Sequence, residues 1–208
     1  RPEQILQSLP SAIQTMLDPA DCGPACLSLC QDIQGETFDY PEEFFKERIH
    51  NIRRPRPDDF QIKEAADKIK SSKNPIIISG GGVFYSEAMD DLATFASKHN
   101  IPVTQTVMGY STMKRDHSHF LGPIGGLGGK AANNFAKKTD LAIAVGTKLG
   151  DFTTGSWANF ENPNFSLVSV NVTRFDASKH MAQSVVGDAK VSLKELSQVL
   201  GDWKASVD

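Results

Sequence analysis

The stretch Asn74-Pro75-Ile76-Ile77-Ile78-Ser79-Gly80-Gly81-Gly82 decides the fold class of this 208-residue chain. A proline precedes an uninterrupted apolar run, and three glycines follow it and turn the chain. An apolar run with no polar residue on either face is typical of a strand buried between two layers of helices. The stretch therefore predicts a central strand of a parallel sheet, with a glycine-rich turn at its carboxyl end.

Further apolar stretches repeat this pattern downstream. Predicted strands occupy 101–104, 141–145, 167–170 and 185–186. Segments with apolar residues at helical spacing separate them: 58–69, capped by Asp58 or Asp59; 86–96, capped by Ser86; 130–137; and 193–200. Strands that alternate with helices in this way are typical of an α/β fold. We therefore predict a three-layer, doubly wound, Rossmann-like parallel sheet over residues 58–208.

The first 57 residues do not follow this alternation. Residues 5–17 have helical apolar spacing with Pro10 inside it, and Ala25–Leu29 is predicted as a strand. One such α/β step cannot bury a core, so residues 1–34 are interpreted as the tail of a preceding domain. Residues 35–57 are interpreted as a connector with one helical turn at 41–45 and a proline-extended end. Because the chain begins at Arg1 with no leader-like profile, we expect a piece of a longer protein.

Composition excludes several classes of function. Lys and Arg number 22 against 25 Asp and Glu, so there is no basic excess for binding nucleic-acid phosphates. The longest apolar runs fall far short of the ~20 residues of a membrane helix. Cys22, Cys26 and Cys30 favour a reduced, cytoplasmic chain, in which they are expected as small buried side chains at the end of a strand. Their spacing, with no second pair, does not match a structural zinc site.

Two groups of glycines mark the candidate binding site. Gly80–Gly82 follows the first strand, and a second group, up to Gly129, precedes the helix at 130–137. Ligands of open α/β sheets bind outside the carboxyl ends of the strands, and a helix N-terminus favours an anion. The two groups together resemble a crevice for a dinucleotide pyrophosphate. The candidate cofactor-binding residues, if a dinucleotide binds, are Gly80, Gly81, Gly82, Gly125, Gly126, Gly146 and Thr147.

The fingerprint of such a site is incomplete. Neither group completes G-x-G-x-x-G, the second does not directly follow a predicted strand, and Asn171 stands where an acidic residue would hold a ribose. Glycines that serve turns and close packing are the alternative. The cluster Asp116-His117-Ser118-His119 lacks a third metal ligand, so hydrogen bonding within a loop is favoured there. No nucleophile elbow, carboxylate pair or phosphate-binding lysine loop occurs, and no catalytic or metal-binding residue is assigned.

The order of the motifs resembles that of the thiamine-diphosphate enzymes. Residues 73–83 are similar to the opening strand of that family's central domain, and 101–109 to its PV-x-x-T-x-x-G strand. Residues 116–128 match its DHP-x-x-x-G-x-x-G loop apart from Ser118 at the proline, and 131–149 resemble the next helix and strand. Residues 23–33 resemble the end of the family's N-terminal pyrimidine-binding domain. The likeness thus covers nearly the whole chain.

One branch of this family hydrolyses a cyclic dione in myo-inositol breakdown. That branch is the most similar to residues 18–55 and 171–180. The resemblance implies a parent enzyme that breaks a C–C bond with thiamine diphosphate as the electron sink and Mg²⁺ on its diphosphate. It also implies that the family's activating Glu and its Gly-Asp-Gly metal motif lie in flanking domains. This segment would then be inert alone and would serve assembly within a homo-oligomer.

An alternative follows from the same resemblance. Acetolactate synthase-like carboligases and decarboxylases share this central domain, and in them it binds FAD. FAD or another nucleotide in the glycine crevice is therefore the second hypothesis. The incomplete glycine pattern and the uncharged Asn171 do not favour it.

Overall fold

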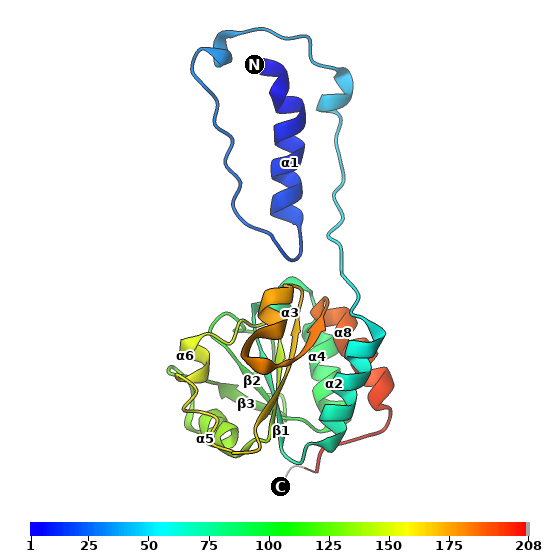
Figure 1. The fold of residues 1–208 in the computed structure, drawn as a ribbon, viewed down its shortest axis with the longest axis vertical. Helices are drawn as coiled ribbons and strands as arrows, with labels where there is room; N and C mark the ends of the chain where they lie inside the picture. The colour runs from blue at the N-terminus through cyan, green and yellow to red at the C-terminus, as the bar shows by residue number, and fades with distance from the viewer. Residues whose placement is uncertain (207–208) are drawn as a thin grey trace. The chain divides into compact units, whose positions relative to one another are not determined.

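The computed structural model describes residues 1–206, and the chain divides into two compact units, Arg1–Arg53 and Arg54–Asp208. The larger unit contains a six-stranded sheet in the order β3-β2-β1-β4-β5-β6, with every neighbouring pair parallel. This order and the flanking helices confirm the predicted doubly wound α/β fold (Figure 1). The strands are β1 (Pro75–Ser79), β2 (Val103–Gln105), β3 (Phe120–Pro123), β4 (Leu141–Val145), β5 (Ser166–Asn171) and β6 (Gln183–Val186).

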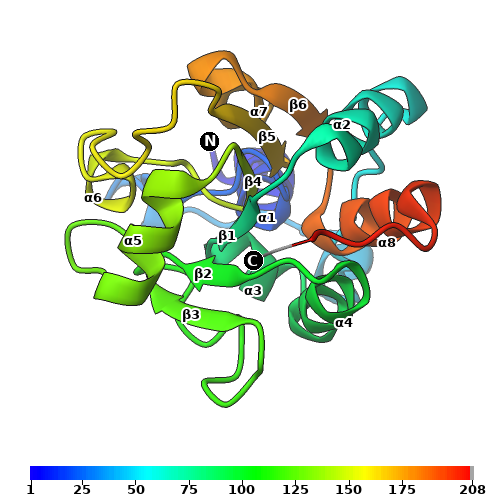
Figure 2. The same cartoon turned by 90° about the horizontal axis from the view of Figure 1, so that it is seen from below.

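Helices cover both faces of this sheet. Figure 2 shows α2, α4 and α8 grouped on one face, with α5 on the other. The helices of this unit are α2 (Asp59–Ser71), α3 (Gly81–Tyr85), α4 (Met89–His99), α5 (Lys130–Lys138), α6 (Asp151–Thr154), α7 (Arg174–Ser178) and α8 (Ala189–Leu200), and a 3-10 turn η4 (Lys179–Met181) follows α7.

The central strand β1 shows why the sheet is buried on both sides. Side chains alternate along a strand, so Ile77 packs into the core shared with α2, α4 and α8. Ile76 and Ile78 point to the opposite core, which contains Ala132 and Ala136 of α5. All five of these side chains are fully buried. The uninterrupted apolar run in the sequence therefore has partners on both faces, as expected.

The helix before β1 is also as predicted. The Asp58 carboxylate accepts a hydrogen bond from the Phe60 N–H at 2.9 Å, which caps the N-terminus of α2. The apolar face of α2 is buried at Ile62, Ala65, Ala66 and Ile69.

Two predictions in this unit are wrong. Ser86 does not cap the second helix. A one-turn helix, α3, begins at Gly81, and Ser86 is its C-cap. The N-cap of α4 is Ala88. Strand β3 was not predicted, because it has four residues at the sheet edge and contains Gly122 at φ +96°. The second glycine group does follow a strand, contrary to the expectation from sequence.

The smaller unit contains the helix α1 (Ile5–Leu17), which confirms the apolar pattern there, and a 3-10 turn at Glu42–Phe45. Further 3-10 turns lie at Pro2–Gln4 and Ile33–Gly35. Ala25–Leu29 forms no strand, since a strand needs a neighbour for its hydrogen bonds and none pairs with it in the described residues. For the same reason the three cysteines are exposed rather than buried, and they are free thiols. No helix within residues 1–206 has the length and hydropathy to cross a membrane.

Candidate functional site

The loops that follow β1 and β4 meet at the carboxyl edge of the sheet, at the point where the strand order reverses. The Gly82 N–H donates to the Gly146 carbonyl at 2.9 Å, and the Gly80 N–H donates to the Val145 carbonyl at 2.9 Å. A Cβ atom on Gly82 would lie 2.6 Å from the Cα of Gly146, which itself has φ +60°. Only glycine allows the two backbones to approach this closely.

The loop between β3 and α5 is packed in a similar way against the segment after β4. The Gly126 N–H donates to the Phe152 carbonyl at 2.8 Å. The side chain of Asn133 closes the loop from within, since its Oδ1 accepts from the Gly125 N–H and its Nδ2 donates to the Gly125 carbonyl, both at 3.0 Å. Sequence reasoning missed Phe152 and Asn133, because neither contact follows from a local pattern.

These contacts bear directly on phosphate binding, which in a glycine-rich loop relies on free backbone N–H groups. Here the N–H groups of Gly80, Gly82, Gly125 and Gly126 already donate within the domain, and that of Gly146 donates to the Val170 carbonyl at 2.8 Å. Five of the seven candidate N–H groups are therefore paired within the domain, and those of Gly81 and Thr147 are not among them.

The residue after β5 is engaged as well. The Asn171 Nδ2 donates to the Thr147 carbonyl at 3.3 Å, and its Oδ1 accepts from the Thr173 N–H at 3.0 Å. Asn171 thus ties the β4 and β5 loops together, and its Oδ1 is already engaged by Thr173. The structure brings the seven candidate residues to one edge of the sheet, and dinucleotide binding by them stays a prediction.

The histidine cluster lies elsewhere, beside the end of α4. His117 Nε2 lies 3.3 Å from the Ser97 hydroxyl, and His119 Nε2 lies 3.1 Å from Asn100 Oδ1. Burial, with a smaller contribution from the neighbouring His117, lowers the pKa of His119. Hydrogen bonding in a loop, favoured from the sequence, is confirmed. In residues 1–206 no group of three or more His, Cys, Asp or Glu side chains is placed to hold a metal ion.

A third histidine was not singled out from the sequence. His99 is fully buried at the end of α4, where Nδ1 lies 2.8 Å from the Trp203 carbonyl and Nε2 lies 3.0 Å from the Ser197 hydroxyl. Burial lowers its pKa, and the hydrogen bond to Trp203 opposes that effect only in part. The Ala205 N–H donates to the His99 carbonyl at 2.9 Å, so this residue fastens the end of the chain to α4. A lone histidine on a helix gives no sequence signal of this role.

The six-stranded, doubly wound sheet with glycine loops paired at its switch point defines an α/β domain of the type found in thiamine-diphosphate enzymes. The chain belongs to the family described as "Thiamine pyrophosphate enzyme, central domain", whose model matches residues 62–196.

Named relatives of high sequence identity narrow the comparison to one kind of enzyme. The chain is 47% identical over 200 residues to 3D-(3,5/4)-trihydroxycyclohexane-1,2-dione hydrolase of Clostridium perfringens (strain 13 / Type A), which covers 96% of this chain and 31% of the relative. It is 43% identical over 203 residues to the protein of that name from Geobacillus thermodenitrificans (strain NG80-2), covering 98% of this chain and 32% of the relative. The chain thus spans about a third of the length of these relatives.

Solved structures share the fold. Benzoylformate decarboxylase from Polynucleobacter necessarius superimposes with a TM-score of 0.77 at 24% identity, over 98% of this chain and 38% of that one. A putative thiamin diphosphate-dependent enzyme from Mycobacterium smegmatis gives a TM-score of 0.75 at 20% identity, with the same coverage. At these identities the comparison establishes the fold alone.

Proposed function

We propose that this central domain belongs to a cytoplasmic, homo-oligomeric enzyme that uses thiamine diphosphate and Mg²⁺ to hydrolyse a C–C bond of a cyclic dione. The observation that carries the proposal is the extent of the similarity to the dione hydrolases. It covers 200 of the 208 residues, and so includes most of residues 1–61, which lie outside the match to the family model. A shared central domain alone would not produce similarity in that part of the chain.

The proposal assigns a role to each part of the chain. Residues 1–34 would be the tail of a pyrimidine-binding domain, 35–57 a connector, and 58–208 the central domain. The last residues of the connector are fixed to the larger unit, since the Asp188 N–H donates to the Pro55 carbonyl at 2.8 Å. The Arg54 guanidinium supports this attachment with ion pairs to Asp188 at 3.2 Å and Glu87 at 3.1 Å.

The described residues do not fit the cofactor itself. Bound thiamine diphosphate supplies an electron sink for the cleaved bond, and its diphosphate needs Mg²⁺ held by oxygen ligands. Residues 1–206 offer no clustered acidic, His or Cys ligands, and the N–H groups of Gly80, Gly82 and Gly146 at the switch point already donate within the domain. In the proposal the cofactor is therefore held by the flanking pyrimidine- and diphosphate-binding domains. The chain described here performs no catalytic step and serves domain spacing and assembly.

The test is turnover by the full-length protein. Supplied with thiamine diphosphate and Mg²⁺, it should open the ring of 3D-(3,5/4)-trihydroxycyclohexane-1,2-dione, and omission of either cofactor should abolish the reaction. The 208-residue chain should show no activity under the same conditions. A full-length protein that leaves the dione intact but decarboxylates or condenses 2-keto acids would refute the proposal in favour of a carboligase.

A further inference from the structure

The last described segment of the larger unit, residues 201–206, is fastened to the end of α4 by two consecutive residues. The His99 carbonyl accepts a hydrogen bond from the Ala205 N–H at 2.9 Å, and the His99 Nδ1 lies 2.8 Å from the Trp203 carbonyl. The Asn100 Nδ2 donates to the Ala205 carbonyl at 2.9 Å. Asn100 ends α4 in the left-handed conformation, at φ +52°, which asparagine tolerates better than most residues. Residues 99 and 100 therefore provide three of the hydrogen bonds that hold this segment.

The hydrogen bonds around the His99 ring fix the position of its proton. A carbonyl can only accept, so Nδ1 carries the proton and donates it to Trp203. Nε2 is then an acceptor, and the Ser197 hydroxyl on α8, 3.0 Å away, donates to it. The Lys98 ammonium can only donate, and it lies 3.2 Å from the same hydroxyl oxygen and 3.4 Å from the Ser197 carbonyl. A directed chain of hydrogen bonds thus runs from the Lys98 charge through one hydroxyl to a neutral imidazole.

A second proton on Nε2 conflicts with this arrangement. The imidazolium Nε2–H and the Lys98 ammonium would then both point at the Ser197 oxygen, so two positive charges would share one neutral acceptor. The His99 ring is also fully buried, which disfavours its charged form. Burial is the larger of the two effects that lower the pKa of His99, and the hydrogen bond to Trp203 opposes them.

The other charged groups on the neighbouring elements do not resolve this conflict. On α8, Lys194 lies one turn before Ser197 and is paired with Asp91 of α4 at 3.5 Å, so these two charges offset each other. In the last segment, Asp202 and Lys204 are exposed, and neither is among the groups that shift the pKa of His99.

The neighbouring His119 faces Asn100 rather than His99. Because the Asn100 Nδ2 donates to Ala205, its Oδ1 is the atom that accepts from the His119 Nε2–H, at 3.1 Å. His119 keeps this donor when it takes up a second proton. The contact therefore survives protonation of His119, and the conflict with a second proton is confined to His99.

The last segment is the part of this arrangement that can move at the lowest cost. On α8, Leu193, Leu196 and Leu200 are at most 3% exposed and belong to the core. Within residues 201–206 only Ala205 is buried, and Trp203 is partly buried against the core. Local opening of this segment would let water reach a charged ring while both helices stay in place.

We propose that His99 is a pH-sensitive latch, which holds residues 201–206 on α4 while its ring is neutral and releases them when Nε2 takes up a second proton. Histidine suits this task because its ordinary pKa lies close to neutral pH. The segment should stay closed above the ordinary histidine pKa of 6.5, and its release should grow as the pH falls below that value. The inference does not depend on which reaction the longer protein catalyses.

Hydrogen exchange of the full-length protein, followed by mass spectrometry from about pH 7.5 to 5, tests the latch, because the Ala205 N–H is protected while it donates to His99. We expect the protection factor of peptides that contain Ala205 to fall severalfold over this range, after correction for the intrinsic effect of pH on exchange. One proton that binds the open ring at the ordinary pKa of 6.5 sets a ceiling of about 30-fold. Peptides that contain Ile101, whose N–H donates to the Ala96 carbonyl at 3.0 Å, should keep their protection. Unchanged protection at Ala205, or an equal loss at Ile101, would overturn the inference.

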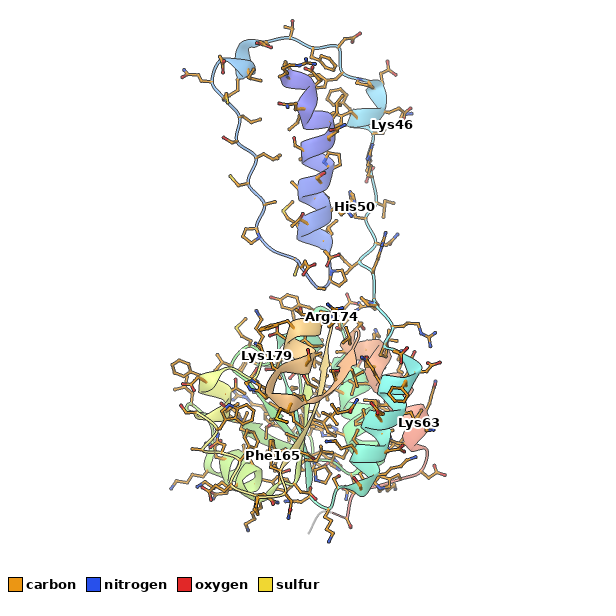
Figure 3. All side chains as sticks on the ribbon, viewed as in Figure 1. Lys46, His50, Lys63, Phe165, Arg174 and Lys179 are labelled. Carbon is orange, nitrogen blue, oxygen red and sulfur yellow. The ribbon has the colours of Figure 1, made fainter. Side chains whose placement is uncertain are left out.

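Two substitutions and a matched control separate the latch from a general loss of stability. Lys98→Gln removes the competing positive charge and should reduce the loss of protection at low pH. Lys63→Gln is the control and should behave as the unmodified protein, because Lys63 is exposed on α2, at the outer side of the larger unit in Figure 3. His99→Gln keeps a donor and an acceptor but does not titrate, so the protection of Ala205 should no longer depend on pH.

Two results with these variants would overturn the inference. One is a loss of protection in Lys98→Gln as large as that in Lys63→Gln, and the other is a pH-dependent loss that persists in His99→Gln. If glutamine fails to hold the segment at any pH, the two lysine variants still decide the outcome.

Discussion

Replacing Gly146 with alanine tests the paired glycine loops. Gly146 has φ +60°, a conformation that costs an L-residue about 1–2 kcal/mol. The new Cβ would also lie 2.6 Å from the Cα of Gly82, and overpacking of this kind costs about 1–3 kcal/mol. Together the two effects lower the free energy of unfolding by roughly 2–5 kcal/mol. Since 1 kcal/mol shifts the midpoint of a domain this size by about 2–4 °C, we expect Tm to fall by roughly 4–20 °C.

Tryptophan fluorescence during heating measures this change in the correct unit, because Trp157 and Trp203 are the two tryptophans of the chain and both lie in the larger unit. Gly126→Ala is the matched control. Its new Cβ would have 3.8 Å to the nearest atom, and Gly126 does not have a positive φ. The control should keep its midpoint within about 2 °C of the unmodified chain. A Gly146→Ala chain that melts together with the control would refute the reasoning that backbone contact explains these glycines.

Three further predictions follow from the same structure. Asp188→Ala should lower the free energy of unfolding by about 2–3 kcal/mol, because it removes a buried cap of α8 and leaves Arg54 without that partner. Asp58→Ala removes an exposed cap and should lower it by about 1 kcal/mol. Urea unfolding of the two variants measures the difference. Burial lowers the pKa of His99, so the folded state disfavours its charged form. The stability from this effect should be full above the ordinary histidine pKa of 6.5 and should fall as the pH decreases below it. His99→Gln should flatten this pH dependence of the unfolding free energy, measured from about pH 7.5 to 5. FAD, ADP and thiamine diphosphate with Mg²⁺ should leave the Tm of the 208-residue chain unchanged, because the N–H groups of Gly80, Gly82, Gly125, Gly126 and Gly146 are engaged. A rise of several degrees with FAD or ADP would show that the loops open for a nucleotide.

The sequence predicted those parts of the fold whose burial follows from their local composition. The apolar run of β1 has no polar residue on either face, and β4 (Leu141–Val145) repeats it, so both strands were identified with nearly correct ends. Strand β3 was missed because an edge strand has only one neighbour and does not need such a run. The strand expected at Ala25–Leu29 failed for the converse reason, since its composition suits a sheet but no neighbouring strand pairs with it in the described residues.

The sequence predicted where the candidate glycines lie, but not whether their N–H groups are free. Topology alone brings the ends of parallel strands to one edge, so the glycines after β1 and β4 had to lie near each other. Whether their N–H groups face a ligand depends on partners that are remote in sequence. Gly125 is closed by Asn133, and Gly126 by the carbonyl of Phe152. No local pattern encodes those contacts, and so a glycine count could not separate a phosphate-binding loop from a packed one.

The paired glycine loops have a physical explanation. A nucleotide cradle needs N–H groups left unpaired until the ligand arrives, and a buried N–H without a partner costs free energy in the ligand-free protein. Here the Gly82 N–H donates to the Gly146 carbonyl and the Gly146 N–H donates to the Val170 carbonyl, so these groups are satisfied without a ligand. Exposed side chains at this edge include the apolar Met108 and Phe152 and the charged Lys148 and Asp151. A glycine loop that binds a nucleotide must leave such N–H groups free, and these loops do so least where their backbones meet.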